Sequence, residues 1–264
     1  MSADPRRPAF QTTFNEKQAR LRTLLAATAS REPSLRQLRS RALRTQFPRV
    51  SAATMQDLVE VTAQTELTGA PRDEHQDQPG TGQVVVPRIP LAIFDAVGGS
   101  PFARIRPVWA GSEAWLPVIE WQPGWVRVLL PTQPDGATGW LDARRITIAR
   151  SRYRIHLALR TGVLSLLRGD QRVGAWSAHL HAEHDAVPVG RSFVLTSVRR
   201  GPATPPMLLR LAVHPHGRDA GLLTVHPRSG PDGAAAGGGI GVSDEAMAAL
   251  HVVSPGCVVH LEAC

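Results

Sequence analysis

The chain has 264 residues and a formal net charge of +8, from 30 Lys and Arg residues against 22 Asp and Glu residues. A hydrophobic content of 42% suffices for a packed core, and 23 glycines with 22 prolines indicate many turns and short elements, which favours β structure. The two cysteines, Cys257 and Cys264, exclude a disulfide framework and a zinc site built from cysteines.

The first 50 residues carry the densest positive charge. They hold eleven Lys and Arg residues against three Asp and Glu residues, a local net of +8, and their leucines recur at helical spacing over residues 13–29 and 33–46. A third short helix, over residues 51–64, begins at the capping residue Ser51, and a polar, acidic, Pro/Gly-rich linker follows. We therefore predict a helical arm and an acidic linker over residues 1–80. The arm either packs on the body or on a partner, or contacts an anionic surface such as nucleic acid or membrane.

Residues 84–148 consist of short alternating β runs separated by turn signals such as "QPG" and "QPDGATG". Strands this short need closure into a small barrel to hide their edges. Five of the six tryptophans fall in this region, so they either form the core and rim of the barrel or line an aromatic ligand groove. The groove candidates are Trp115, Trp125 and Trp140.

Residues 152–264 are again mostly β runs, and the stretch "DGAAAGGGIGVSDEAMAAL" from Asp232 to Leu250 lies before the last of them. The right half of this stretch predicts a helix start, because Ser243 can cap it and Asp244 and Glu245 fall in its first turn. The left half is a run of alanines and glycines whose side chains carry no chemistry.

The order of these elements resembles a known family. Residues 152–264 resemble an L,D-transpeptidase catalytic domain of the YkuD type, through "IHLALRTGVLSLLRGDQRVGAW", "VPVGRSFVL", "LLRLAVH", "GLLTVH" and "IGVSDEAMAALHVVSPGCVVHLEA". Residues 84–148 resemble a bacterial Src-homology-3-like barrel of the cell-wall type, through "WLPV", "GWVRVLLP" and "GATGWL". Actinobacterial members of the family carry such a barrel before the catalytic domain. The resemblance implies a mainly β fold: a small β-barrel followed by an L,D-transpeptidase-like β sandwich, with the helical arm at the N-terminus.

The resemblance also implies where an active site would lie. The family uses a cysteine nucleophile in a Ser-His-Gly-Cys-Ile-Arg motif, with a histidine to take the thiol proton and backbone amides to hold the oxyanion. In this chain the upstream strand ends in His226, and the nucleophile position is Gly239. No catalytic residue is intact, and the vestigial active site comprises His226, Ala236, Gly237, Gly238, Gly239 and Gly241. We expect Cys257 and Cys264 to be unreactive, because the family has threonine near the first position and the second ends the chain.

Other histidines offer a weaker hypothesis. His179 and His181 on a strand would place both rings on one face, with His184 nearby. No recognised ligand spacing is completed elsewhere, so we expect no metal and no cofactor. His226 itself is either part of the vestigial site or a structural histidine at a strand end.

These features predict a catalytically inactive L,D-transpeptidase-like protein that acts as a binding or scaffold module in peptidoglycan metabolism, with a stem peptide or a cell-wall protein as partner. Two alternatives remain: an active transpeptidase with a non-standard site, and a cytoplasmic interaction protein that uses its basic arm. No stretch approaches the roughly 18 apolar residues of a membrane span, and the N-terminus shows no signal-peptide pattern, so we expect a cytoplasmic protein. Because the family acts outside the membrane, a start codon upstream of Met1, which would add an export signal, is the alternative. The sequence assigns no oligomeric state.

Overall fold

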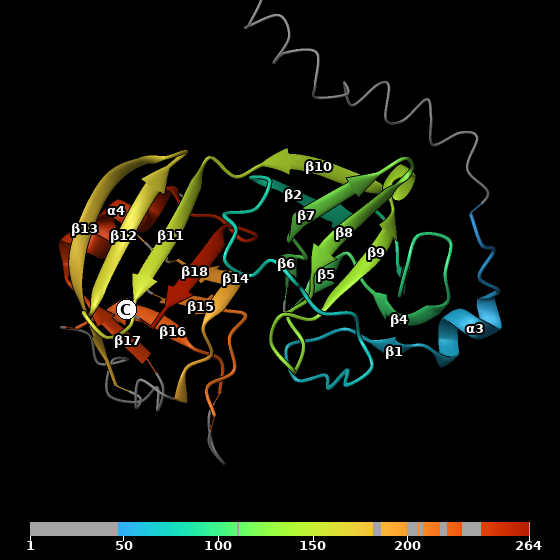
Figure 1. Ribbon diagram of the computed structural model, residues 1–264, viewed down its shortest axis with the longest axis horizontal. Coiled ribbons are helices and arrows are strands. Elements are labelled where there is room, and N and C mark those ends of the chain that lie inside the picture. The colour runs from blue at the N-terminus through green and yellow to red at the C-terminus, as the bar shows by residue number, and fades with distance from the viewer. Residues whose placement is uncertain are drawn as a thin grey trace, which may run out of the picture.

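The structure is a computed structural model, and it describes residues 47–109, 111–181, 186–199, 205, 208–216, 221–228 and 239–263. Within these residues the protein is mainly β and consists of two β units side by side (Figure 1). The predicted fold class, with one β unit following another, is therefore confirmed for this part of the chain. The helices predicted over residues 13–29 and 33–46 lie outside the described residues.

The third predicted helix is shorter than expected. Helix α3 spans Ala52–Asp57, and the hydroxyl of Ser51 caps it by accepting from the backbone N–H of Thr54 at 3.0 Å. The prediction of helix as far as residue 64 is wrong, because the chain continues into strand β1 (Val59–Glu60), which pairs in parallel with β4 (Pro101–Ile105). The β-branched valines that follow the helix favour extended backbone, and sheet pairing satisfies that preference.

The first unit is built around an eight-stranded sheet with the order β1-β4-β3-β9-β8-β7-β2-β10. Its other strands are β2 (Gln83–Pro87), β3 (Leu91–Phe94), β7 (Leu116–Gln122), β8 (Trp125–Leu129), β9 (Thr138–Asp142) and β10 (Ile146–Arg150). A small hairpin of β5 (Val108–Trp109) and β6 (Ser112–Glu113) and the 3-10 turn η1 (Ala143–Arg145) complete the unit.

The polar segment between β1 and β2 is packed rather than a free tether. Leu67 and Ala70 are buried in the same core as Val85 and Leu116. The segment also forms isolated bridges to the stretch before β9, for example Arg72 to Ala137. A polar composition predicted a linker here, but a few apolar residues suffice to hold it on the sheet.

The second unit closes into a ring of eight strands in the order β11-β12-β13-β17-β16-β15-β14-β18. The long strands β13 (Gln171–Leu180) and β14 (Gly190–Val198) each pair with different neighbours at their two ends, so two packed sheets share them as common edges. The remaining strands are β11 (Tyr153–Ala158), β12 (Val163–Arg168), β15 (Leu208–Leu211), β16 (Thr224–Pro227), β17 (Gly239–Val242) and β18 (Val258–Glu262).

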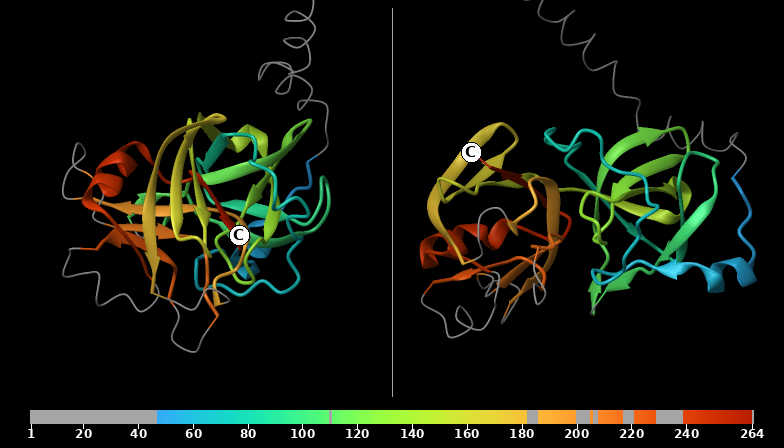
Figure 2. Two further views of the ribbon diagram at one scale, coloured as in Figure 1. Left: turned by 60° about the vertical axis from the view of Figure 1, so that its left-hand side comes forward. Right: turned by 60° about the horizontal axis from the view of Figure 1, so that its bottom comes forward.

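Helix α4 (Asp244–Ala249) packs on this unit at the side away from the first unit (Figures 1 and 2). Ser243 caps it by accepting from the backbone N–H of Ala246 at 3.2 Å, as its sequence predicts. Ala246 and Met247 are buried in the core of the second unit, and the 3-10 turn η4 (Leu250–Val252) follows.

The two units are joined by polar contacts that are buried or half-buried. Asp73, from the segment before β2, accepts two hydrogen bonds from the NH2 group of Arg191 on β14, at 2.7 and 2.9 Å, and one from its Nε. Asp135 of the first unit pairs with His214, which follows β15. Phe193 of β14 extends the apolar core of the first unit. Within the described part of the chain, no helix has the length and apolar character needed to cross a bilayer.

Candidate functional site

The region around His226 lies where three strands meet. Strand β17 lies between β16 and the end of β13, so that His226 is opposite Gly241 and Thr224 is opposite Gly239. Just past the end of β13, His181 donates its backbone N–H to the carbonyl of Gly239 at 3.0 Å. The sequence leaves 12 residues between His226 and Gly239, and sheet pairing brings them together.

Three imidazole rings gather around this strand. The rings of His181 and His226 are stacked, with centroids 5.6 Å apart and an interplanar angle of 14°. The rings of His179 and His181 are perpendicular, with centroids 5.1 Å apart. Burial lowers the pKa of His181, and the positive charges that His179 and His226 would carry lower it further. The cluster therefore favours a neutral His181 at physiological pH.

His226 is completely buried and its two ring nitrogens have different environments. Nδ1 donates to the carbonyl of Pro227 at 3.0 Å, and Nε2 points toward Gly239. Nε2 and the neighbouring hydroxyl of Thr224 are both buried, and neither has a hydrogen-bond partner among the residues that the structure describes. Unpaired buried polar atoms are costly, and they mark a place where a ligand or water can bind.

Gly239 has no room for a side chain. A Cβ atom at this position would overlap Nε2 of His226 and would lie 2.7 Å from its Cδ2 and 3.2 Å from Oγ1 of Thr224. The His226 ring therefore occupies the space into which a residue-239 side chain would project. At Gly241 a Cβ would lie 2.9 Å from Cγ of Arg228 and 3.3 Å from Nε2 of His181. Neighbouring side chains fill both positions.

Chemically, the described residues of this site can accept and donate hydrogen bonds but lack an activated nucleophile. The hydroxyl of Thr224 lies beside Gly239, and it has no hydrogen-bond partner within the described part of the chain. Sequence reasoning did not single out Thr224. The available signal was its position two residues before His226, which places both side chains on the same face of β16. Ala236, Gly237, Gly238 and His184 lie outside the described residues.

The cysteines do not replace the nucleophile within the described chain. Cys257 is completely buried in the core of the second unit, and its thiol donates to the carbonyl of Tyr153 at 3.2 Å. Burial raises the pKa of Cys257 to about 12, which leaves the thiol protonated and poorly nucleophilic at neutral pH. Cys264 lies outside the described residues.

The histidine pair considered for metal binding is exposed, and His181 stacks on His226 instead of converging with His179 on one point. Among the residues that the structure describes, no group of three or more His, Cys, Asp or Glu side chains is arranged to hold a metal ion.

The three tryptophans considered for a groove do not lie together. Trp125 and Trp140 are buried in one small cluster with Ala92 and Phe94. Trp115 is half-buried outside that cluster, and its indole N–H donates to Glu113 at 3.0 Å. The aromatic surface that the structure does form involves Phe47, which stacks on Trp125 and which the sequence reasoning missed.

The fold and the site thus define a mainly β protein of two units. In its second unit the glycine-containing strand β17 lies beside the buried His226, and among the described residues only Nδ1 of this histidine has a hydrogen-bond partner. No family model and no curated protein matches the sequence. The chain resembles solved structures of L,D-transpeptidases. L,D-transpeptidase 1 from Mycobacterium tuberculosis is 10% identical over 47% of this chain and 77% of that chain, with a TM-score of 0.31.

Two further structures show a likeness of the same size. L,D-transpeptidase 3 from Mycobacterium tuberculosis, in complex with a faropenem-derived adduct, is 12% identical over 52% of this chain and 91% of that chain, with a TM-score of 0.32. An L,D-transpeptidase from Mycobacterium smegmatis is 11% identical over 52% of this chain and 90% of that chain, with a TM-score of 0.30. A likeness this weak carries no information about activity, which has to come from the chain's own residues.

Proposed function

We propose that this chain is a catalytically inactive protein of the L,D-transpeptidase type that serves as a binding module in peptidoglycan metabolism. The observation that carries the proposal is the contact between Gly239 and the buried ring of His226. A transpeptidase of this type needs a thiolate beside a base, in a geometry that holds the reacting atoms about 3–3.5 Å apart. Here a histidine, His226, is present, but Gly239 has no side chain and no space for one.

A binding role uses what the site retains. Within the described residues, Nε2 of His226 and the hydroxyl of Thr224 have no hydrogen-bond partner, and these atoms suit the amide and carboxylate groups of a peptide. Strand β17 is paired on both sides, so a peptide would bind across this end of the sheet and not as an added strand. We propose a peptidoglycan stem peptide as the ligand.

Catalytic inactivity is tested by intact-mass spectrometry after incubation of the full chain with faropenem. We expect no covalent adduct. A stoichiometric adduct that disappears in Cys257→Ser would show that the nucleophile has moved, and inactivity would then be wrong. An adduct that persists in Cys257→Ser would place the nucleophile elsewhere and would equally overturn inactivity.

The binding role is tested separately by co-sedimentation with purified peptidoglycan sacculi and by titration with a stem tetrapeptide. We expect sedimentation of the wild type, and weaker binding by the near-isosteric variant Thr224→Val, because the hydroxyl is then lost without a change of shape. Failure of the wild type to bind either probe would overturn the binding role while leaving inactivity intact. In that outcome, the alternative of a cytoplasmic interaction protein acting through its basic arm becomes the better explanation.

A further inference from the structure

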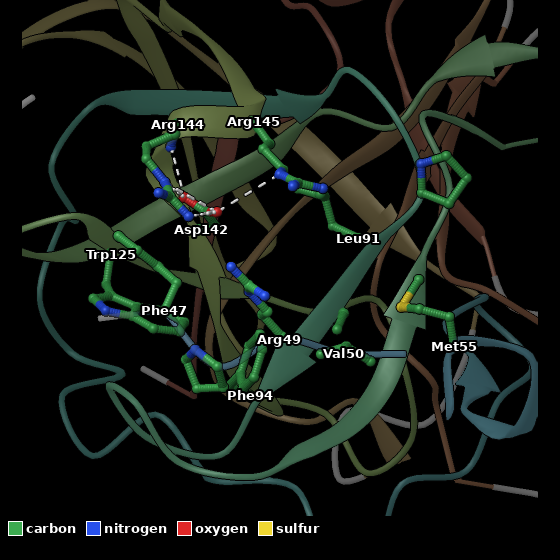
Figure 3. A pocket seen from close by; sticks show the side chains of 13 residues that line it. Phe47, Arg49, Val50, Met55, Leu91, Phe94, Trp125, Asp142, Arg144 and Arg145 are labelled. Carbon is green, nitrogen blue, oxygen red and sulfur yellow. Dashed lines mark hydrogen bonds and ion pairs between the residues drawn. The ribbon is translucent and has the colours of Figure 1, made fainter. Parts of the chain in front are cut away.

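A pocket of about 520 Å³ lies on the first unit, far along the chain from His226. Its walls come from the segment 47–50, from Met55 of α3, from strands β3 and β8, and from the turn η1. The apolar part includes Met55, Leu91 and Phe94 (Figure 3). A volume of this size is typical of sites for small organic molecules.

The pocket carries an excess of positive charge. The guanidinium groups of Arg49, Arg144 and Arg145 extend into the same space (Figure 3), and Asp142 is the one carboxylate among the described lining residues. Asp142 is engaged by Arg144, through Nε to Oδ1 at 2.9 Å and NH2 to Oδ2 at 2.8 Å. Arg145 reaches it only at 3.8 Å, and Arg49 forms no ion pair with a described residue. The lining residues that the structure describes therefore hold a net charge of +2.

An aromatic contact holds one of the cationic groups, that of Arg144, and anchors the segment that carries Arg49. Phe47 stacks on Trp125 with centroids 5.0 Å apart, and the guanidinium of Arg144 lies 3.6 Å above the Phe47 ring. Because Phe47 anchors the segment that carries Arg49, this arginine is brought to the pocket before any ligand arrives. Converging like charges repel one another, and an anion that bridges them removes this repulsion.

We propose that this pocket binds the phosphoryl group of a small organic phosphate, between Arg49 and Arg145. A dianionic phosphoryl group matches the net charge of +2, whereas a carboxylate would neutralise only half of it. Guanidinium groups also present paired donors that suit phosphate oxygens. The organic part of the ligand then lies on the apolar wall formed by Met55, Leu91 and Phe94.

The test is isothermal titration calorimetry of the full chain at low salt with phenyl phosphate, inorganic phosphate and benzoate. We expect a dissociation constant of about 1 mM or below for phenyl phosphate. Benzoate should bind about tenfold more weakly because it carries one charge fewer, and inorganic phosphate should bind more weakly because it lacks the apolar part. Benzoate binding equal to or tighter than phenyl phosphate binding would overturn the proposal, and so would no binding of phenyl phosphate.

Variants localise the site. Arg49→Gln and Arg145→Gln should each weaken phenyl phosphate binding about five- to tenfold, because each removes one charge-assisted contact. Phe47→Ala should weaken binding to a similar extent, since Arg49 is then no longer anchored. The matched control is Arg150→Gln, an exposed arginine on β10 outside the lining, which should change affinity less than about twofold. Equal losses in Arg145→Gln and Arg150→Gln would show non-specific attraction to a basic surface and would contradict the proposed site.

Discussion

Substituting Gly239 by alanine tests the central geometric feature of the candidate site. The added Cβ would overlap Nε2 of His226 and approach Oγ1 of Thr224 at 3.2 Å. His226 is completely buried, so its ring cannot swing into solvent without disturbing the core. Overpacking of this kind costs about 1–3 kcal/mol of unfolding free energy. We therefore expect Gly239→Ala to be destabilised by about that amount.

A matched glycine provides the control. A Cβ at Gly69 would meet no atom within 4 Å, and no positive φ is recorded there. A Gly→Ala change at such a position stabilises by about 0.4–1 kcal/mol by restricting the unfolded chain. Gly69→Ala should therefore be as stable as the wild type or slightly more stable.

The assay is urea-induced unfolding, with midpoints compared at an unchanged m value. His226→Ala removes the ring that causes the overlap, so adding Gly239→Ala to it should cost almost nothing. The double-mutant cycle should then show a coupling of about 1–3 kcal/mol between the two positions. If Gly239→Ala is as stable as the wild type, or loses the same free energy whether or not the His226 ring is present, then the ring does not occupy this space and the reasoning fails.

Two further predictions concern the contacts between the units. Asp73→Ala should lower the unfolding free energy by about 3–5 kcal/mol, because it leaves Arg191 charged and buried without its carboxylate partner. Replacing both residues by leucine should cost much less. The measurement is urea-induced unfolding, and a loss below about 1 kcal/mol for Asp73→Ala would contradict the prediction. For His214, burial lowers the pKa, but the hydrogen bond and the charge of Asp135 outweigh it and leave the pKa raised. This contact therefore stabilises the fold fully below the unfolded-state pKa of histidine, and its contribution is lost as the pH rises through the raised folded-state pKa. The difference in unfolding free energy between wild type and Asp135→Asn should consequently be larger at pH 5.5 than at pH 8.5. A difference that grows with pH would refute the assignment.

Local signals in the sequence were sufficient for elements whose stability is local. Ser243, Asp244 and Glu245 predicted the start of α4, because a cap and a favourable first turn need only neighbouring residues. The same reasoning overextended α3, where Val59 and Glu60 pair with a strand more than 40 residues away in the sequence. Propensity within a short window does not contain that partner.

The sequence by itself determined that the chain is mainly β, that its first 50 residues carry the densest positive charge, and that a run of glycines precedes the last helix. Only the tertiary structure decided what fills the space at Gly239. The parallel pairing of β16 with β17 places the buried His226 ring against it, and this depends on strand order across a long loop. The pocket at Phe47 has the same origin. In the sequence, 77 residues lie between Phe47 and Trp125, and 18 lie between Trp125 and Arg144. Their rings and guanidinium stack only because the segment before α3 packs against β8 and η1. Contacts of this kind carry no local periodicity, so no pattern along the chain could have predicted them.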